Sequence, residues 1–314
     1  MTRLIQVLVA VLFISSNLYA NEQIKIVGSS TVYPFTTVVA EQFGKGKFKT
    51  PVVESTGTGG GMKLFCAGVD LTTPSATNAS RAIKDKEAEL CAKNGVSYIE
   101  IMIGNDGIAF VNSNNSTKMN VTKQQLWQAM ADKGNKPALW SDIDASLPKQ
   151  KIAILTPPAT SGTRDAWNEL VMMAGCDEAV KKAKKDDCVL LREDGAVIEA
   201  GENDSLLIQK VQAEPDYFAI LGYSYYDNAR DKIQAADIEG KSISLASIQD
   251  YSYPIARPLF VYFKKEHFSV VPGLKEFMQT YVSRRMMGDK GQLVSRGLVP
   301  LDAKTQAEMV SRTK

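Results

Sequence analysis

The segment Pro157–Trp167 reads PPATSGTRDAW and places Ser161, Thr163 and Arg164 where an apolar strand gives way to a helix. The first backbone N–H groups of a helix have no partner inside the helix, and this end of the helix attracts anions. Two hydroxyls and a planar guanidinium at the same place suit the capture of an oxyanion. We therefore expect an oxyanion site at this helix start.

Two other segments have the same layout. Residues Ile24–Val27 (IKIV) run into Gly28–Pro34 (GSSTVYP), and Val52–Glu54 (VVE) runs into Ser55–Lys63 (STGTGGGMK). One such helix start is weak evidence of a site, because Ser and Thr are ordinary N-cap residues. Three of them, each after a short β-rich run, favour a shared anion site.

Strand-like and helix-like runs alternate along the chain, which predicts an α/β fold of mostly parallel sheets flanked by helices. We expect strands at 24–27, 51–54, 97–103, 108–112, 152–155 and 253–262, helices at 34–43, 62–66, 84–94, 123–130 and 165–175, and a loop between 66 and 84. The runs 97–112 and 253–262 would cross between two lobes. Lobe 1 would then be discontinuous, with residues 21–104 and 256–314, and lobe 2 would span 105–255.

The first twenty residues carry Arg3, an apolar run from Ile5 to Ile14 and a polar stretch that ends at Ala20. This pattern predicts a secretory signal peptide cleaved after Ala20. No cysteine for a lipid anchor follows the apolar run, so we expect a soluble exported protein. The 37 basic and 35 acidic residues nearly balance. The chain therefore lacks the large net positive charge that would attract nucleic acid or membrane surfaces.

The chain has four cysteines and one histidine. In an exported protein an even number of cysteines indicates disulfides, and their order suggests Cys66 with Cys91 and Cys176 with Cys188. Four buried thiols are the alternative. The single His267 argues against histidine-rich metal sites and a Ser-His-Asp triad, so we expect no metal, no cofactor and no catalytic residue.

The glycine-rich run Gly57–Gly61 does not match a nucleotide loop. A Walker loop needs Gly before its Lys and Ser or Thr after it, but Lys63 lies between Met62 and Leu64. Met62 also stands where a Rossmann fingerprint needs its last glycine. The run can still let backbone N–H groups approach a small anion, with Thr58 as a hydroxyl donor. A tight turn that caps a helix is the alternative.

Two arginines are candidates for the anion. Arg81 follows Ser80 just before a predicted helix, and a plain surface arginine is its alternative. Arg164 has the better claim, beside two hydroxyls at a helix start. A helix-surface ion pair with Asp165 or Glu169 is the alternative for Arg164.

Seven segments together resemble the periplasmic phosphate-binding proteins of ABC transporters, within the type II periplasmic binding proteins. They are Gly28–Pro34, Gly57–Lys63, Ala79–Lys84, Asp106–Val111, Ser161–Arg164, Ala219–Tyr223 and Tyr253–Leu259. The resemblance implies a two-lobed, monomeric periplasmic protein that closes over inorganic phosphate and passes it to a membrane permease. Other tetrahedral oxyanions, such as sulfate or molybdate, are the alternative cargo. A secreted phosphatase is the alternative from another class.

The resemblance also implies the phosphate ligands. They are Ser30, Thr31, the Val32 amide, Thr58, Ser80, Arg81, Ser161, Gly162, Thr163 and Arg164.

One position departs from the family pattern. In one branch of the family an aspartate that is taken to accept the phosphate proton occupies the Arg81 position. Here Asp106, in Asn105-Asp106-Gly107, is the nearest candidate for that acceptor. Because Asp-Gly is a common turn pair, a plain turn is the alternative role for Asp106.

Overall fold

The computed structural model describes residues 23–159, 161–201 and 203–314. The expected signal peptide lies outside these residues. Within them, no helix combines the length and the apolar character that crossing a membrane would require.

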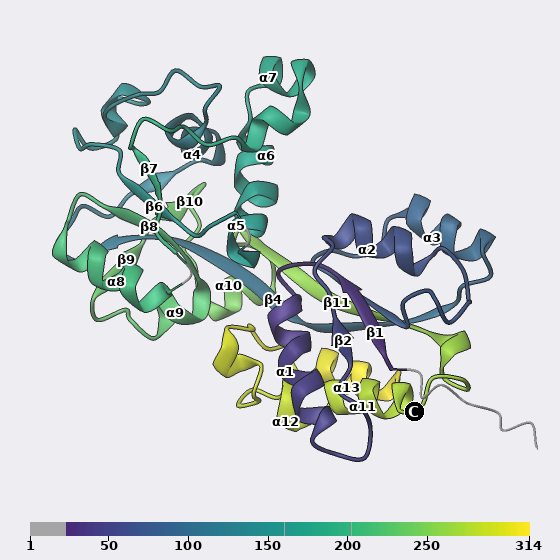
Figure 1. The fold of residues 1–314 in the computed structure, drawn as a ribbon. Helices are drawn as coiled ribbons and strands as arrows, with labels where there is room; N and C mark the ends of the chain where they lie inside the picture. Colours follow the sequence, from purple (N-terminus) through teal and green to yellow (C-terminus); the bar gives the residue numbers. More distant parts are fainter. Residues whose placement is uncertain (1–22, 160, 202) are drawn as a thin grey trace, which may run out of the picture.

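The fold is a mixed α/β fold of two lobes built on one continuous sheet (Figure 1). In lobe 1 the order is β2 (Val52–Val53), β1 (Lys25–Gly28), β3 (Ala76–Ala79), β11 (Ala256–Lys264) and β4 (Tyr98–Ser113). The strands β2, β1 and β3 are parallel, and β11 runs antiparallel to β3 and β4.

In lobe 2 the sheet continues from β4 through β8 (Phe218–Gly222) and β6 (Ile154–Thr156) to β7 (Val197–Glu199), with β9 (Ile233–Ala235) also paired to β4. Strands β8, β6 and β7 are parallel to one another. A separate pair joins β10 (Asp237–Ile238) to β5 (Asn120–Val121).

Helices cover both lobes. Those of lobe 1 are α1 (Tyr33–Gly44), α2 (Thr58–Phe65), α3 (Asp85–Lys93), α11 (Leu274–Tyr281), α12 (Arg284–Met287) and α13 (Ala303–Ser311), with the 3₁₀ turns η4 (Lys265–His267) and η5 (Val294–Arg296). Those of lobe 2 are α4 (Lys123–Met130), α5 (Gly162–Trp167), α6 (Met173–Gly175), α7 (Glu178–Ala183), α8 (Asp204–Ala213), α9 (Tyr223–Asp227) and α10 (Leu245–Gln249), with the 3₁₀ turns η1 (Trp140–Asp142) and η3 (Lys185–Val189). Between α5 and α6 lies a π-helical stretch, η2 (Asn168–Met172).

The structure corrects the sequence prediction at β3. This strand falls in the predicted loop, yet it lies between β1 and β11, and all four of its residues are buried. Its sequence, ATNA, holds a single β-branched residue, Thr77, and no aromatic one, which is too weak a signal for a strand. Its polar side chains make long-range hydrogen bonds inside lobe 1, where Asn78 Oδ1 accepts from the Thr36 hydroxyl at 2.8 Å and the Thr77 hydroxyl donates to the Val27 carbonyl at 3.2 Å.

A second correction concerns Asn105-Asp106-Gly107, which is no turn. The two predicted strands form one strand, β4, that runs through both lobes beside β11, with Asp106 opposite Arg257 (Figure 1). Gly104 lets β4 pass close to Leu298, since an added Cβ would lie 2.6 Å from the Leu298 side chain.

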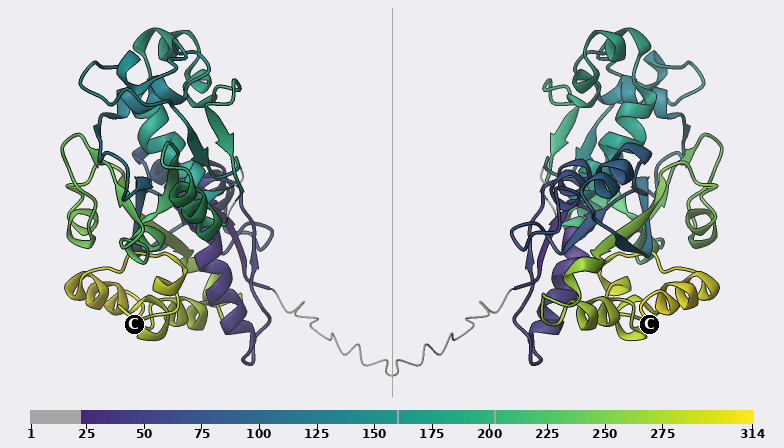
Figure 2. Two further views of the ribbon diagram at one scale, coloured as in Figure 1. Left: turned by 90° about the vertical axis from the view of Figure 1, so that its left-hand side faces the viewer. Right: turned by 90° about the vertical axis from the view of Figure 1, so that its right-hand side faces the viewer.

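Each lobe has its own hydrophobic core. One cluster joins the early chain, such as Ile26 and Val39, to the late chain, such as Val261 and Phe277. A second cluster is drawn mostly from lobe 2, where the Phe110 and Phe218 rings stack with centroids 4.8 Å apart. A third, smaller cluster of lobe 1 surrounds Cys66 and Cys91. The side views show the C-terminal helices against α1 in lobe 1 (Figure 2).

Two disulfides pair the cysteines as their order suggested. Cys66 is bonded to Cys91, and Cys176 is bonded to Cys188. The first joins the end of α2 to α3, and the second joins the end of α6 to η3. Each therefore fixes a helix that borders the candidate site.

Candidate functional site

Three helix starts, those of α1, α2 and α5, lie at the junction between the lobes. Their N-cap residues are Val32, Gly57 and Ser161, and none of the three makes a side-chain cap. A helix start without a side-chain cap keeps N–H groups that can bind an anion.

Six of the expected ligands line one hollow of about 500 Å³, which we call the hydroxyl hollow. They are Ser30, Thr31, Asp106, Ser161, Gly162 and Thr163. The lobes touch here, because the Thr31 hydroxyl donates to the Gly162 carbonyl at 3.0 Å.

Three further expected ligands, Thr58, Ser80 and Arg81, line a neighbouring hollow of about 410 Å³, the arginine hollow. The Thr58 and Ser80 hydroxyls lie 3.0 Å apart, and the Ser80 amide donates to the Thr58 hydroxyl at 3.1 Å. Asp165 and Glu169 of lobe 2 line the same hollow. The structure thus divides nine of the expected ligands between two adjoining hollows.

Arg257, which the sequence prediction missed, connects the two hollows. Its side chain is 5% exposed, with Nη2 donating to the Thr31 hydroxyl at 2.7 Å and Nη1 to Glu169 Oε2 at 2.7 Å. The available signal was a charged residue in the apolar strand 253–262, inside a segment that carries the family resemblance.

Asp106 faces Arg257 at the floor of the hydroxyl hollow. Asp106 Oδ2 lies 3.5 Å from Arg257 Nε, and neither atom has a hydrogen-bond partner among the described residues. Burial raises the pKa of the Asp106 carboxyl, while the charge of Arg257 acts in the opposite direction. Because buried polar atoms are normally hydrogen-bonded, this pair suits a ligand that offers both an acceptor and a proton.

Arg81 lies at its hollow as an ion pair. Its two Nη atoms each bond a Glu87 carboxylate oxygen at 2.8 Å. The hydrogen bond with Glu87 raises the pKa of Arg81 against the effect of burial, and the charge of Glu169 adds to the rise. Arg81 is therefore neither a free surface arginine nor an unpaired cation.

Arg164 does not join the other candidates. Its guanidinium donates to Asn168 Oδ1 at 3.2 Å and to the Pro157 carbonyl at 3.2 Å, and it lies 3.4 Å from Glu199. Arg164 and Asn168 line a different hollow from Ser161, Gly162 and Thr163. Its ion-pair partner is neither of the two carboxylates expected from the sequence.

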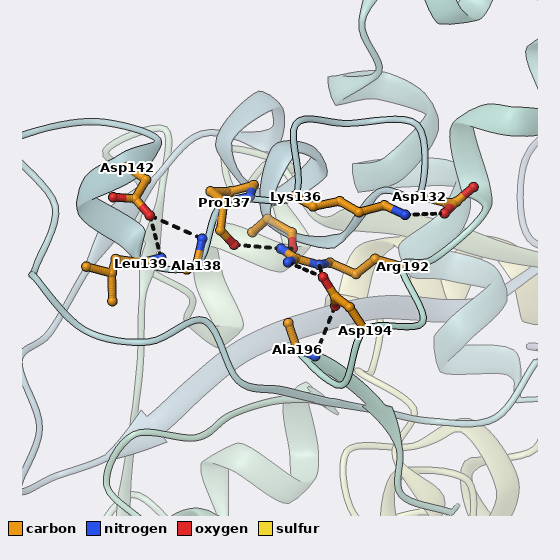
Figure 3. A network of polar contacts seen from close by, with 10 residues as sticks. Asp132, Lys136, Pro137, Ala138, Leu139, Asp142, Arg192, Asp194 and Ala196 are labelled. Atoms are coloured by element: carbon orange, nitrogen blue, oxygen red, sulfur yellow. Dashed lines mark hydrogen bonds and ion pairs between the residues drawn. The ribbon is translucent and has the colours of Figure 1, made fainter.

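Arg164 and Arg192 share a third hollow, behind α5. Arg192 donates to the Pro137 carbonyl at 2.8 Å and to Asp194, and it holds two loops together (Figure 3).

The remaining expected ligand is the backbone amide of Val32. The Val32 side chain is buried, and its amide makes a long contact of 3.4 Å with the Ser29 hydroxyl.

Arg296 is a second residue that the sequence prediction missed. It is exposed in η5 and lines the hydroxyl hollow with Tyr33 and Tyr225. Its side chain has no ion pair or hydrogen bond with any described residue. A lone arginine in a polar surface turn gives no sequence signal.

The chain matches a known family over most of its length. The model of the PBP superfamily domain matches residues 17–285. Protein SphX of Synechococcus elongatus is 30% identical, covering 91% of this chain and 79% of SphX. The phosphate-binding protein PstS of Staphylococcus saprophyticus is 30% identical, covering 92% of this chain and 84% of PstS.

Solved structures show the same fold. A possible phosphate binding protein from Planctomyces limnophilus has a TM-score of 0.78 and 28% identity, covering 93% of this chain and 97% of that protein. An ABC-type phosphate transport receptor from Vibrio cholerae has a TM-score of 0.61 and 19% identity, covering 88% and 98%. The second likeness concerns the fold alone.

Proposed function

The chain belongs to the PBP superfamily, among the PstS-like phosphate-binding proteins, and we propose that it captures inorganic phosphate between its lobes and delivers it to an ABC transporter permease. The lobes would comprise residues 21–104 with 256–314, and residues 105–255. The protein would act in the periplasm as a monomer, after removal of its signal peptide. It would bind phosphate without chemical change.

The observation that carries this proposal is the pair of Asp106 and Arg257 at the floor of the hydroxyl hollow. Monohydrogen phosphate offers one proton and several anionic oxygens. An ionised Asp106 would accept the proton, and Arg257 with the Thr31, Ser161 and Thr163 hydroxyls would donate to the oxygens.

The other proposed ligands are Ser30, the Val32 amide, Thr58, Ser80, Arg81 and Gly162. Several of them lie in the arginine hollow, and lobe closure would bring the two hollows together around one anion. Arg164 is not among the proposed ligands, because its guanidinium faces Glu199.

Calorimetric titration of protein stripped of ligand tests this function, with phosphate, sulfate and molybdate as titrants. We expect tight binding of phosphate alone. The absence of phosphate binding would refute the proposal, and turnover of a chromogenic phosphomonoester would favour the phosphatase instead.

The substitution Asp106→Asn tests how phosphate is chosen over sulfate. Sulfate has no proton at neutral pH, so it would place an oxygen against the buried Asp106 carboxylate. The Asn amide can donate to that oxygen. We expect the variant to keep phosphate binding and to admit sulfate; continued rejection of sulfate would show that the acceptor lies elsewhere.

A further inference from the structure

Glu169 lies among groups that would bind an anion. It belongs to the π-helical stretch η2 and lines the arginine hollow together with Thr58, Ser80 and Arg81. A carboxylate in this position repels a phosphate dianion, so its presence opposes the proposed function unless it moves or has a partner. Its partner is Arg257, at 2.7 Å.

The three donor nitrogens of Arg257 have different surroundings. Nη2 bonds the Thr31 hydroxyl, Nη1 bonds Glu169, and Nε faces Asp106 without a hydrogen bond. Of the two carboxylates, the Asp106 side chain is 15% exposed and the Glu169 side chain 47% exposed. Asp106 is fixed in β4 opposite Arg257 in β11, so Glu169 is the partner that is free to leave.

A carboxylate and a phosphate present similar pairs of oxygens to a guanidinium fork. A buried arginine that loses a charged hydrogen-bond acceptor is destabilised. Asp106 supplies negative charge near Nε but makes no hydrogen bond with it, whereas Nη1 donates to Glu169, so another anion must accept from Nη1 when Glu169 leaves. Glu169 would be the acceptor when phosphate is absent.

We propose that Glu169 is an internal competitor for the anion, which holds Arg257 in the phosphate-free protein and is displaced from it when phosphate binds. This inference rests on the proposed function. It assigns to Glu169 a control over affinity, because each binding event must first break the ion pair between Glu169 and Arg257. An anion with weaker contacts elsewhere in the site would fail to displace the carboxylate.

The substitution Glu169→Gln tests this proposal, since it keeps the size of the side chain and removes its charge. We expect phosphate to bind roughly tenfold more tightly to the variant in calorimetric titration, because a charge-assisted hydrogen bond no longer competes. The matched control is Glu308→Gln in α13, which removes the same charge from an exposed ion pair with Arg312. We expect no gain in affinity from the control.

A second experiment repeats Glu169→Gln in protein that already carries Arg257→Gln. It separates competition for Arg257 from simple charge repulsion between Glu169 and phosphate. If Glu169 acts through Arg257, then the gain from Glu169→Gln is smaller in this background, where only the repulsion between Glu169 and phosphate is relieved. A gain in the background as large as in the single variant, or an unchanged or weaker affinity in the single variant, would overturn the proposal. An absence of phosphate binding in the wild-type protein would instead refute the proposed function, and thermal unfolding would confirm that each variant is folded.

Discussion

Four arginines differ in whether a carboxylate neutralises them. Two were predicted as anion ligands from the sequence, and the structure adds the other two. Arg81 pairs with Glu87, Arg164 with Glu199 and Arg257 with Glu169, whereas Arg296 has no partner among the described residues. An arginine that is paired with a carboxylate adds little net positive charge to the site. Binding at this site would therefore depend on exchange of partners and on hydroxyl and amide donors.

The contrast between Arg257 and Arg164 leads to a first prediction. Arg257→Ala should weaken phosphate binding at least about 100-fold, because it removes the charge-assisted donors that lie beside Thr31 and Asp106 of the hydroxyl hollow. Arg164→Ala should weaken binding much less, since its guanidinium faces Glu199. Calorimetric titration of both variants checks this, and a greater loss from Arg164→Ala would contradict the placement of the site.

The buried Lys264 gives a pH-dependent prediction. Its ammonium donates to the Gly68 carbonyl at 2.6 Å and to Thr73 at 2.7 Å, and burial lowers the pKa of Lys264 from 10.5 to about 8. Between these two values the unfolded chain holds a proton that the folded protein has lost. The contribution of Lys264 to the free energy of unfolding should therefore rise as the pH increases from about 8 to 10.5.

Lys264→Met is the comparison for this effect. The difference in unfolding free energy between wild type and variant, from denaturant titrations, should shift in favour of the wild type over that pH range by on the order of 2 kcal/mol. Both proteins contain the same buried tyrosines, so the effect of tyrosine titration cancels in the difference between their unfolding free energies. A difference that stays constant with pH would show that the pKa of Lys264 is not lowered.

At the residue scale, sequence could find the hydroxyls but not the direction of each charged side chain. Ser161 and Thr163 carry a helix-start signal, and both lie at the hydroxyl hollow. Arg164 has the same signal, yet its guanidinium bonds Asn168 and the Pro157 carbonyl and lines another hollow. The placement of the Arg257 side chain depends on its contact with Glu169, which lies 88 residues away along the chain. No local pattern encodes such a contact.

At the scale of elements, the helix starts were the most predictable feature and β3 the least. The strand-to-helix segments at β1–α1, β2–α2 and β6–α5 combine apolar runs with capping residues, which are local signals. The strand ATNA of β3 is defined by its neighbours β1 and β11 and by the side chains of Thr77 and Asn78, which are buried and hydrogen-bonded. These are long-range contacts.

The start of α5 carries a prediction about lobe contact. A Cβ added at Gly162 would lie 2.6 Å from the Thr31 Cα, in the other lobe. Gly162→Ala should therefore push the lobes apart and weaken phosphate binding, while the stability of each core changes little. The matched control is Gly60→Ala near the start of α2, where the nearest atom, Thr56 Cβ, is 3.7 Å away. Equal affinities in the two variants, measured by calorimetry, would show that the lobes need not approach this closely.

At the scale of the whole molecule, the two-lobed arrangement could be predicted because the crossover segments are recognisable. The runs 97–112 and 253–262 are apolar and lie far apart in sequence, and the structure joins them as β4 and β11. The continuity of β4 through both lobes was not predictable from Asn105-Asp106-Gly107, which has the composition of a turn. The pairing with β11 overrides that local preference.

This hinge leads to the last prediction, which concerns the change of shape on binding. Two paired strands connect the lobes, and the pairing shifts register between Leu259 and Phe260, where a strand bends more easily. Away from the hinge strands, the Thr31–Gly162 hydrogen bond links the lobes, and Glu169 of lobe 2 contacts Arg257 of β11. An anion held by ligands from both lobes would add contacts that exist only in the closed form, so phosphate should shift the population toward the compact state. Small-angle scattering of protein stripped of ligand should show a smaller radius of gyration at saturating phosphate, and no change with sulfate. Identical profiles with and without phosphate would mean that the lobes do not close on the ligand.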